Sequence, residues 1–320
     1  PVNRNYPEGG FKNFGGGAGG TYDMAGALRH SVNTWFVELE DRVGVRRTAQ
    51  LAYDMGLTSL PLEGERAITE KDAALTLGAY EASPLQVASA YATFAAEGKA
   101  CRPIGITKVV GPKGENLTVP SPDCKQVMKE STANTMTAML TTVVDGSDSG
   151  RTGNLASLGD RPVAGKTGST NDYGAAWFAG YTPQYATAVW VGDPRGPQFN
   201  MESGVSAYGG TVFFAPVFGG SIPAMVFQDV MTRIHEGLPV EEFSPPGGSS
   251  ALGLTAFIPD VRGLTPEVAF GVLQRYGFTP KLEKGGKTVP GLPEGVVSQT
   301  KPASGPWDPE DGREVTVLVP

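Results

Sequence analysis

The segment DRPVAGKTGSTNDYG, residues 160–174, contains the tripeptide Gly165-Lys166-Thr167. The same three residues end a nucleotide-binding P-loop, which needs a further glycine with four residues in between. That position is Asp160, whose carboxylate would repel a phosphate, and Gly159 is one residue too far away. The segment therefore does not predict a nucleotide site, and the residues around it must explain its chemistry.

Two runs of aromatic and β-branched residues follow within GAAWFAGYTPQYATAVWVG, residues 174–192. They meet at Thr182-Pro183-Gln184, which predicts a β-hairpin. Together with the strand around Lys166 they predict an antiparallel sheet, and we expect Trp177 and Trp190 to lie in its core.

Helical patterns precede and follow this sheet. We expect helices over residues 21–30 (with Thr21 as N-cap), 34–44, 83–98, 130–144 and, after the sheet, 215–237. Helices followed by hairpin-connected strands predict an α+β fold with an antiparallel sheet.

The helix over residues 83–98 has the clearest boundaries. Ser83 is its expected N-cap, Pro84 its first residue, and Gln86 completes a capping box. Its expected buried stripe is Leu85, Ala88, Tyr91 and Phe94.

A second domain is predicted near the carboxyl end. Residues 241–254 have the Pro, Gly and Ser content of a linker, which separates a domain over 1–240 from one over 255–320. In the smaller domain, Thr265 and Pro266 begin a helix whose expected apolar stripe is Val268, Val272 and Leu273.

Composition excludes several classes of protein. The net charge of -7 argues against a nucleic-acid partner, which requires a basic surface. With two histidines and two cysteines, a metal site such as zinc is not expected. No uninterrupted apolar run of about 20 residues predicts a membrane span.

The two cysteines, Cys101 and Cys124, flank a predicted hairpin with its turn at 111–114. They can close a disulfide bridge, which would stabilise by about 3 kcal/mol and indicate an oxidising compartment, or they can remain free thiols. Both alternatives are open at this point.

Two short motifs carry a resemblance to a known family. Ser31-Val32-Asn33, between two predicted helices, and Lys166 to Ser169 (KTGS) resemble the S-x-N and K-T-G motifs of penicillin-binding transpeptidases, in the family's order. Residues 75–99 and 165–183 are similar to class A penicillin-binding proteins of the actinobacterial type. Residues 258–278 and 295–305 resemble a PASTA domain.

The resemblance implies catalytic roles for three residues. Ser31 would pass a proton between the lysine of a third motif, S-x-x-K, and the leaving nitrogen. Asn33 would offer its amide to the substrate backbone, and Lys166 would place positive charge beside the substrate's terminal carboxylate.

It also implies a substrate-binding role for the residues after Lys166. The hydroxyls of Thr167 and Ser169 would bind the terminal carboxylate. Gly168 would let the substrate lie flat against the strand, and the backbone N–H of Ser169 would serve as an oxyanion donor. Asp172 and Tyr173 are expected at the edge of the cleft.

The family's nucleophile, the serine of S-x-x-K, is expected several tens of residues before S-x-N, but only thirty residues precede Ser31. The sole match, Ser298 to Lys301, lies in the PASTA-like domain and reads as a surface strand. We therefore expect the nucleophile on an upstream fragment. His30 has no identifiable acid partner and is expected to be structural; His235 is expected to interact with a helix carboxyl end.

The expected function is that of a serine D,D-transpeptidase that needs no cofactor. Peptidoglycan stem peptides and β-lactam antibiotics would be its ligands, and an upstream transmembrane helix would anchor it on the extracytoplasmic face of the membrane. Two alternatives remain: a β-lactam or muropeptide sensor without turnover, and a D,D-carboxypeptidase or β-lactamase of the same fold. For the PASTA-like domain, two roles are open at this point: binding of muropeptide or β-lactam, and a spacer, which we favour.

Overall fold

The structure is a computed structural model. It describes residues 10–14, 20–146, 148–207, 211–246, 257–258, 261–275, 278–287, 289, 293–303, 305–306 and 314–320. Contacts divide the chain into two units, Pro1–Ser244 and Pro245–Pro320. Within the described ranges, no helix is long and apolar enough to cross a membrane.

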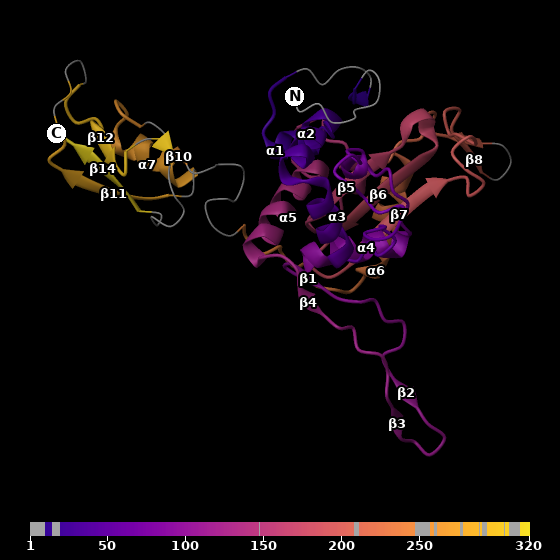
Figure 1. Cartoon of the computed structure of the whole chain (residues 1–320). Helices are drawn as coiled ribbons and strands as arrows, with labels where there is room; N and C mark the ends of the chain where they lie inside the picture. Colours follow the sequence, from indigo (N-terminus) through magenta and orange to yellow (C-terminus); the bar gives the residue numbers. More distant parts are fainter. Residues whose placement is uncertain are drawn as a thin grey trace. The chain divides into compact units, whose positions relative to one another are not determined.

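The first unit contains six α-helices and three short 3-10 helices among its described residues (Figure 1). They are α1 (Met24–Arg29), α2 (Asn33–Val43), α3 (Val45–Asp54), η2 (Leu75–Leu77), α4 (Pro84–Ala95), α5 (Glu130–Val144), η3 (Asn154–Ala156), η4 (Asn171–Tyr173) and α6 (Ile222–Ile234). The five predicted helices are confirmed as α1, α2, α4, α5 and α6. The N-cap of α1 is Asp23 and not Thr21, because the Asp23 carboxylate accepts a hydrogen bond from the backbone of Gly26.

Helix α3 was not predicted, because its amino end is capped from a distance. Gly44 ends α2 and the chain begins α3 at the next residue. The backbone N–H groups of Val45 and Arg46 donate to the carboxylate of Glu70, more than 20 residues later. A cap supplied from so far along the chain leaves no local pattern in the sequence.

The capping box of α4 is confirmed, but its predicted stripe is partly wrong. The hydroxyl of Ser83 and the side chain of Gln86 exchange hydrogen bonds with each other's backbone. Leu85 lies in the first turn of the helix and is 63% exposed. The fully buried positions are Ala90 and Thr93.

The central sheet has the order β5-β6-β7 and is antiparallel throughout, as predicted. Its strands are β5 (Ala164–Ser169), β6 (Ala175–Tyr181) and β7 (Ala186–Gly192). Trp177 and Trp190 are cross-strand partners, but Trp190 is 37% exposed, so its predicted place in the core is wrong.

Two hydrophobic clusters bury the sheet. Phe178 of β6 packs with Phe227 and Met231 of α6. Tyr181 lies three residues further along β6, on the opposite face, and packs with Leu140 and Val143 of α5. Helices therefore cover both faces, and β5 at the sheet edge is held between them.

A disulfide-closed arm projects from the first unit between α4 and α5 (Figure 1). We call residues 99–126 the arm. At its base β1 (Lys99–Ala100) pairs with β4 (Lys125–Gln126), and further out β2 (Val109–Val110) pairs with β3 (Asn116–Leu117). Cys101 and Cys124 are bonded, with an S–S distance of 2.03 Å.

The segment after α6 packs back on the first unit. The buried guanidinium of Arg161 donates to the carbonyls of Leu238 and Pro239, and the ring of Phe243 lies 5.5 Å from that of Tyr181. The beginning of the predicted linker thus contacts this unit, while its residues 247–254 lie outside the described ones. A short hairpin of β8 (Val205–Ala207) and β9 (Thr211–Phe213) lies before α6.

The second unit packs one helix against small sheets. Its elements are β10 (Phe257–Ile258), α7 (Pro266–Arg275), β11 (Thr279–Lys284), β12 (Gln299–Lys301), β13 (Gly305–Pro306) and β14 (Glu314–Val319), with sheet orders β11-β14-β12 and β10-β13. Leu273 is buried as predicted, but Val268 is 52% exposed and Ala269 takes its place in the core. Ser298 is buried and its hydroxyl donates to Leu318, so it does not lie on a surface strand.

Candidate active site

Ser31 lies in a strained turn between two helices. Helix α1 ends at Arg29 and α2 begins at Asn33. Ser31 adopts a left-handed backbone conformation with φ of 55°, which is uncommon for a residue other than glycine. The buried Val32 anchors the turn through a 2.9 Å backbone hydrogen bond to Ala27. Strain of this kind persists where the surroundings fix the backbone, and it often accompanies a functional site.

The structure brings Lys166 to Ser31 from 135 residues away. The ammonium Nζ of Lys166 donates to the Ser31 hydroxyl at 2.8 Å and to the carbonyl of Thr167 at 3.0 Å. Burial of the ammonium group disfavours its charge and lowers the pKa of Lys166 to about 8. A lysine with this pKa can hold or release a proton near neutral pH, and the Ser31 hydroxyl is in direct contact with it.

The hydroxyls of Thr167 and Ser169 are held by contacts from other segments. The Thr167 hydroxyl donates to Thr152 at 2.9 Å. The Ser169 hydroxyl accepts a hydrogen bond from the backbone N–H of Gly219 at 3.0 Å. Both side chains are thereby oriented before any ligand binds, which is how a preorganised binding site is built.

Gly168 lies close to two neighbouring segments, in addition to its expected role in substrate access. A Cβ atom at Gly168 would lie 3.2 Å from Cβ of its cross-strand partner Trp177. A Cβ atom at Gly219 would lie 2.6 Å from the carbonyl oxygen of Gly168, too close for any other residue. The loop before α6 therefore lies directly against the backbone of the K-T-G strand, and the Ser169 hydroxyl bonds to it as well.

Asn33 is the first residue of α2, and its amide donates to the carbonyl of Lys12 at 3.1 Å. Within the described ranges it makes no hydrogen bond to Ser31 or Lys166. The neighbouring Asn13 bonds to Thr34. The side-chain amide of Asn33, which was expected to bind the substrate, is thus bound by the segment over residues 10–14. Among the described residues, only the backbone of the turn connects Asn33 to Ser31.

Three aromatic rings gather next to the K-T-G strand. Tyr173 has its ring centre 6.4 Å from that of Phe14 and 5.5 Å from that of Phe218. Phe14 and Phe218 are 5.4 Å apart. Phe218 directly precedes Gly219, so the cluster lies beside the hydroxyl of Ser169. Tyr173 belongs to this cluster, whereas Asp172 is exposed.

His30 does have an acid partner, contrary to our expectation. Asp148, which follows α5, contacts His30 at 3.2 Å and Arg29 at 2.8 Å. The hydrogen bond from the backbone N–H of Gly150 lowers the pKa of the Asp148 carboxyl most, and the hydrogen bond from the Arg29 side chain lowers it further. The network ties the end of α1 to the loop after α5, so His30 is structural and Lys166 is the group that contacts Ser31. His235 caps α6 as predicted and is also bound to Thr182.

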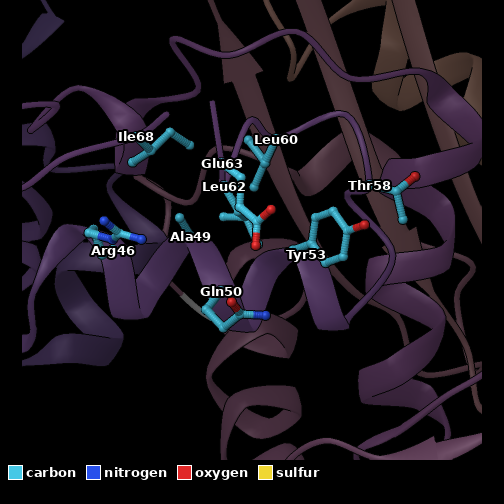
Figure 2. A pocket seen from close by; sticks show the side chains of 9 residues that line it. All are labelled: Arg46, Ala49, Gln50, Tyr53, Thr58, Leu60, Leu62, Glu63 and Ile68. Carbon is cyan, nitrogen blue, oxygen red and sulfur yellow. The ribbon is translucent and has the colours of Figure 1, made fainter. Parts of the chain in front are cut away.

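A hollow of the first unit lies away from these residues. It has a volume of about 570 Å³ and is lined by α3, through Ala49 and Tyr53, and by the segment around Leu60 (Figure 2). It contains none of the predicted site residues. The predicted residues meet instead on β5 and at the junction of α1 and α2.

Sequence reasoning missed four residues that support the site: Asp148, Thr152, Phe218 and Gly219. Each lies in a loop and acts through a contact more than ten residues away along the chain. The one local sign was the pair Gly219-Gly220, since adjacent glycines often mark a close approach of backbone. A Cβ atom at Gly220 would lie 2.1 Å from the carbonyl oxygen of Thr152.

A contact between a serine hydroxyl and a lysine is an arrangement that acyl-transfer enzymes use, and here it lies at the edge of an antiparallel sheet. The sequence matches the penicillin-binding protein transpeptidase domain over residues 4–210 and the PASTA domain over residues 256–319. The chain belongs to the penicillin-binding protein transpeptidase family.

Named relatives agree with this family. Penicillin-binding protein 1A of Aquifex aeolicus is 37% identical over 71% of this chain, and that of Mycolicibacterium smegmatis is 31% identical over 78%. The chain covers only 28% and 32% of these two relatives.

Solved structures show the same fold. The PonA1 protein of Mycobacterium tuberculosis in complex with penicillin V matches with a TM-score of 0.63 and 27% identity, covering 76% of this chain and 64% of that one. Penicillin-binding protein 1A of Haemophilus influenzae matches with a TM-score of 0.59 at 22% identity, over 75% of this chain and 38% of that one, which supports the fold alone.

Proposed function

We propose that the first unit is part of a D,D-transpeptidase that cross-links peptidoglycan stem peptides through a serine acyl-enzyme. The observation that carries the proposal is the 2.8 Å hydrogen bond from Lys166 to Ser31, which joins the K-T-G and S-x-N motifs into one proton path. The nucleophile would be the serine of an S-x-x-K segment upstream of residue 1.

In the first half-reaction, the upstream serine gives its hydroxyl proton to the lysine of the same S-x-x-K segment and attacks the carbonyl between the two terminal D-alanines. The C–N bond breaks and free D-alanine leaves, so its nitrogen must gain a proton. Ser31 can pass that proton to the nitrogen and recover one from Lys166, to which it is already hydrogen-bonded. The acyl group remains on the serine as an ester.

Before this step the substrate must be placed correctly. The terminal carboxylate would bind to the hydroxyls of Thr167 and Ser169, with the charge of Lys166 nearby. The backbone N–H of Ser169 would stabilise the oxyanion, and Asn33 would orient the peptide. In the second half-reaction an amine from a neighbouring stem attacks the ester, and its proton passes through Ser31 to Lys166. The upstream serine leaves and regains its proton from the lysine of its own segment.

The proposed place of action is the extracytoplasmic face of the membrane, with a transmembrane anchor upstream. The disulfide between Cys101 and Cys124 supports this location, since such bonds persist in oxidising compartments. β-Lactams would acylate the same serine, as expected for the family. The PASTA domain would act as a spacer.

The test uses the whole protein with its upstream segment and a stem peptide that ends in D-Ala-D-Ala. A transpeptidase releases D-alanine and forms cross-linked dimer when an amine acceptor is present, and penicillin blocks both. Release of D-alanine without dimer would indicate a carboxypeptidase. Penicillin binding without any release of D-alanine would indicate a sensor.

A further inference from the structure

The arm carries a charge opposite to that of the rest of the chain. Residues 99–126 hold five basic and two acidic side chains, a net charge of +3, whereas the whole chain has -7. Arg102 is paired with Asp123. The four lysines, Lys99, Lys108, Lys113 and Lys125, have no ion pair within the described part of the chain. The arm therefore presents free positive charge away from an acidic body.

The outer part of the arm also exposes aliphatic side chains. Ile106 is 57% exposed, Val110 54% and Leu117 47%, and no residue from 99 to 126 is buried. Leu117 pairs with Val109 and Val110 with Asn116, on adjacent rungs of the hairpin. Side chains on adjacent rungs point to opposite faces, so the aliphatic surface is present on both sides of the ribbon.

This distribution favours one kind of partner. A groove on a protein would cover one face of the ribbon, and a soluble polyanion would use the lysines but not the aliphatic side chains. The boundary between lipid headgroups and acyl chains surrounds an inserted hairpin on every side. Anionic lipids attract lysines, whose long side chains reach back to the phosphates.

We propose that the arm is a membrane-binding element that inserts Ile106, Val110 and Leu117 into the headgroup region of an anionic lipid bilayer, with Lys108 and Lys113 bound to lipid phosphates. The inference goes beyond acyl transfer and rests on the proposed function only for its location beside a membrane. Repulsion between the acidic body and the same lipids would direct the arm toward the surface. The disulfide at the base would keep the two strands together.

The test is co-sedimentation of the 320-residue chain with phosphatidylcholine vesicles that contain about 30% phosphatidylglycerol, against pure phosphatidylcholine. Lys108→Gln with Lys113→Gln should lower the partition coefficient about 10-fold. Val110→Thr with Leu117→Thr should lower it about 5-fold at unchanged charge. The matched controls are Lys71→Gln with Lys284→Gln and Leu282→Thr with Val289→Thr, which change exposed residues elsewhere.

Equal binding to both vesicle types, or wild-type binding by both arm variants, would overturn the proposal. If only the lysine variant is weakened, and binding to soluble polyglutamate falls in parallel, the arm recognises acidic polymer or protein and not lipid. Penicillin acylation of the whole protein with the same arm variants should be unchanged. Vesicle binding without acylation would contradict the proposed function and leave this inference standing.

Discussion

The K-T-G strand and the arm are both built of short antiparallel strands, yet they are stabilised in opposite ways. Lys166, Thr167 and Ser169 bond to partners 135, 15 and 50 residues away. Between Lys99 and Gln126 the strands pair only with one another, and no side chain is buried.

The difference shows where changes should matter. A substitution in the sheet removes contacts made by several elements at once. A substitution in the arm removes only contacts within the arm. The rest of the first unit should remain folded, because the strands of the arm pair with one another.

The largest effect on stability is expected for Phe178→Ala. Phe178 is fully buried against Phe227, with ring centres 4.8 Å apart, and its removal should lower the free energy of unfolding by about 3–5 kcal/mol. Ile106→Ala on the arm should change it by less than about 0.5 kcal/mol. Urea unfolding of both variants measures the difference, and similar losses would refute the comparison.

Lys166→Ala should lower kcat/KM for penicillin acylation of the whole protein by about 10²–10³-fold, because a positioned charge and proton donor are lost. Because the pKa of Lys166 is about 8, wild-type acylation should fall as pH rises through 8, when the ammonium group loses its charge. Lys166→Arg should retain some acylation above that pH.

Stopped-flow acylation between pH 6 and 10 measures this effect, with Lys125→Ala on the arm as the control. A profile that stays flat through pH 8 in the wild type would show that the charge of Lys166 is not used. Acylation of Lys166→Ala at the wild-type rate would remove it from the proposed mechanism.

Glu40→Gln should stabilise the protein in alkaline solution. Glu40 on α2 is buried, and one of its carboxylate oxygens has no hydrogen-bond partner among the described residues. Burial raises its pKa to about 7. The folded state therefore binds a proton that the unfolded chain, with a pKa near 4.5, releases. The free energy of unfolding of the wild type should fall by about 3 kcal/mol as pH rises from about 4.5 to 7, and it should stay low above pH 7.

Thermal unfolding at pH 5 and pH 8 tests this prediction. Glu40→Gln should unfold at a higher temperature than the wild type at pH 8, and the two should be close at pH 5. The exposed Glu38 on the same helix provides the control, since Glu38→Gln should leave the pH dependence unchanged.

The smallest global effect is expected for Cys101→Ser with Cys124→Ser. The bond closes a loop without buried residues, so its loss should free the arm without unfolding the sheet. The melting temperature should fall by less than about 2 °C, while tryptic cleavage at Lys108 and Lys113 should rise about 10-fold. A large fall in melting temperature would mean that the arm supports the fold.

Much of the fold could be predicted because its boundaries are encoded locally. The capping box of Ser83 and Gln86 and the hairpin at Thr182 to Gln184 use neighbouring residues, and both are confirmed. Leu85, Val268 and Trp190 were placed in the core wrongly, since periodicity identifies an apolar face but not where the covering element ends.

The site was predicted in part. Ser31 and Lys166 were assigned through resemblance to a family, and no spacing in the sequence indicates that they touch. Asp148 could not be found because its partner His30 lies 118 residues away along the chain. Gly219 could not be found because its role is to leave room for the backbone of Gly168 and Trp177, which a side chain would fill. Contacts of this kind can be seen only in the folded structure.

The most direct test of the central claim is to locate the penicillin adduct. The whole protein with its upstream segment would be treated with penicillin, digested, and analysed by peptide mass spectrometry. Our account predicts the adduct on a serine upstream of residue 1, with its rate of formation reduced by Ser31→Ala and Lys166→Ala. An adduct on Ser31 or any other serine of this chain, or no adduct, would contradict it.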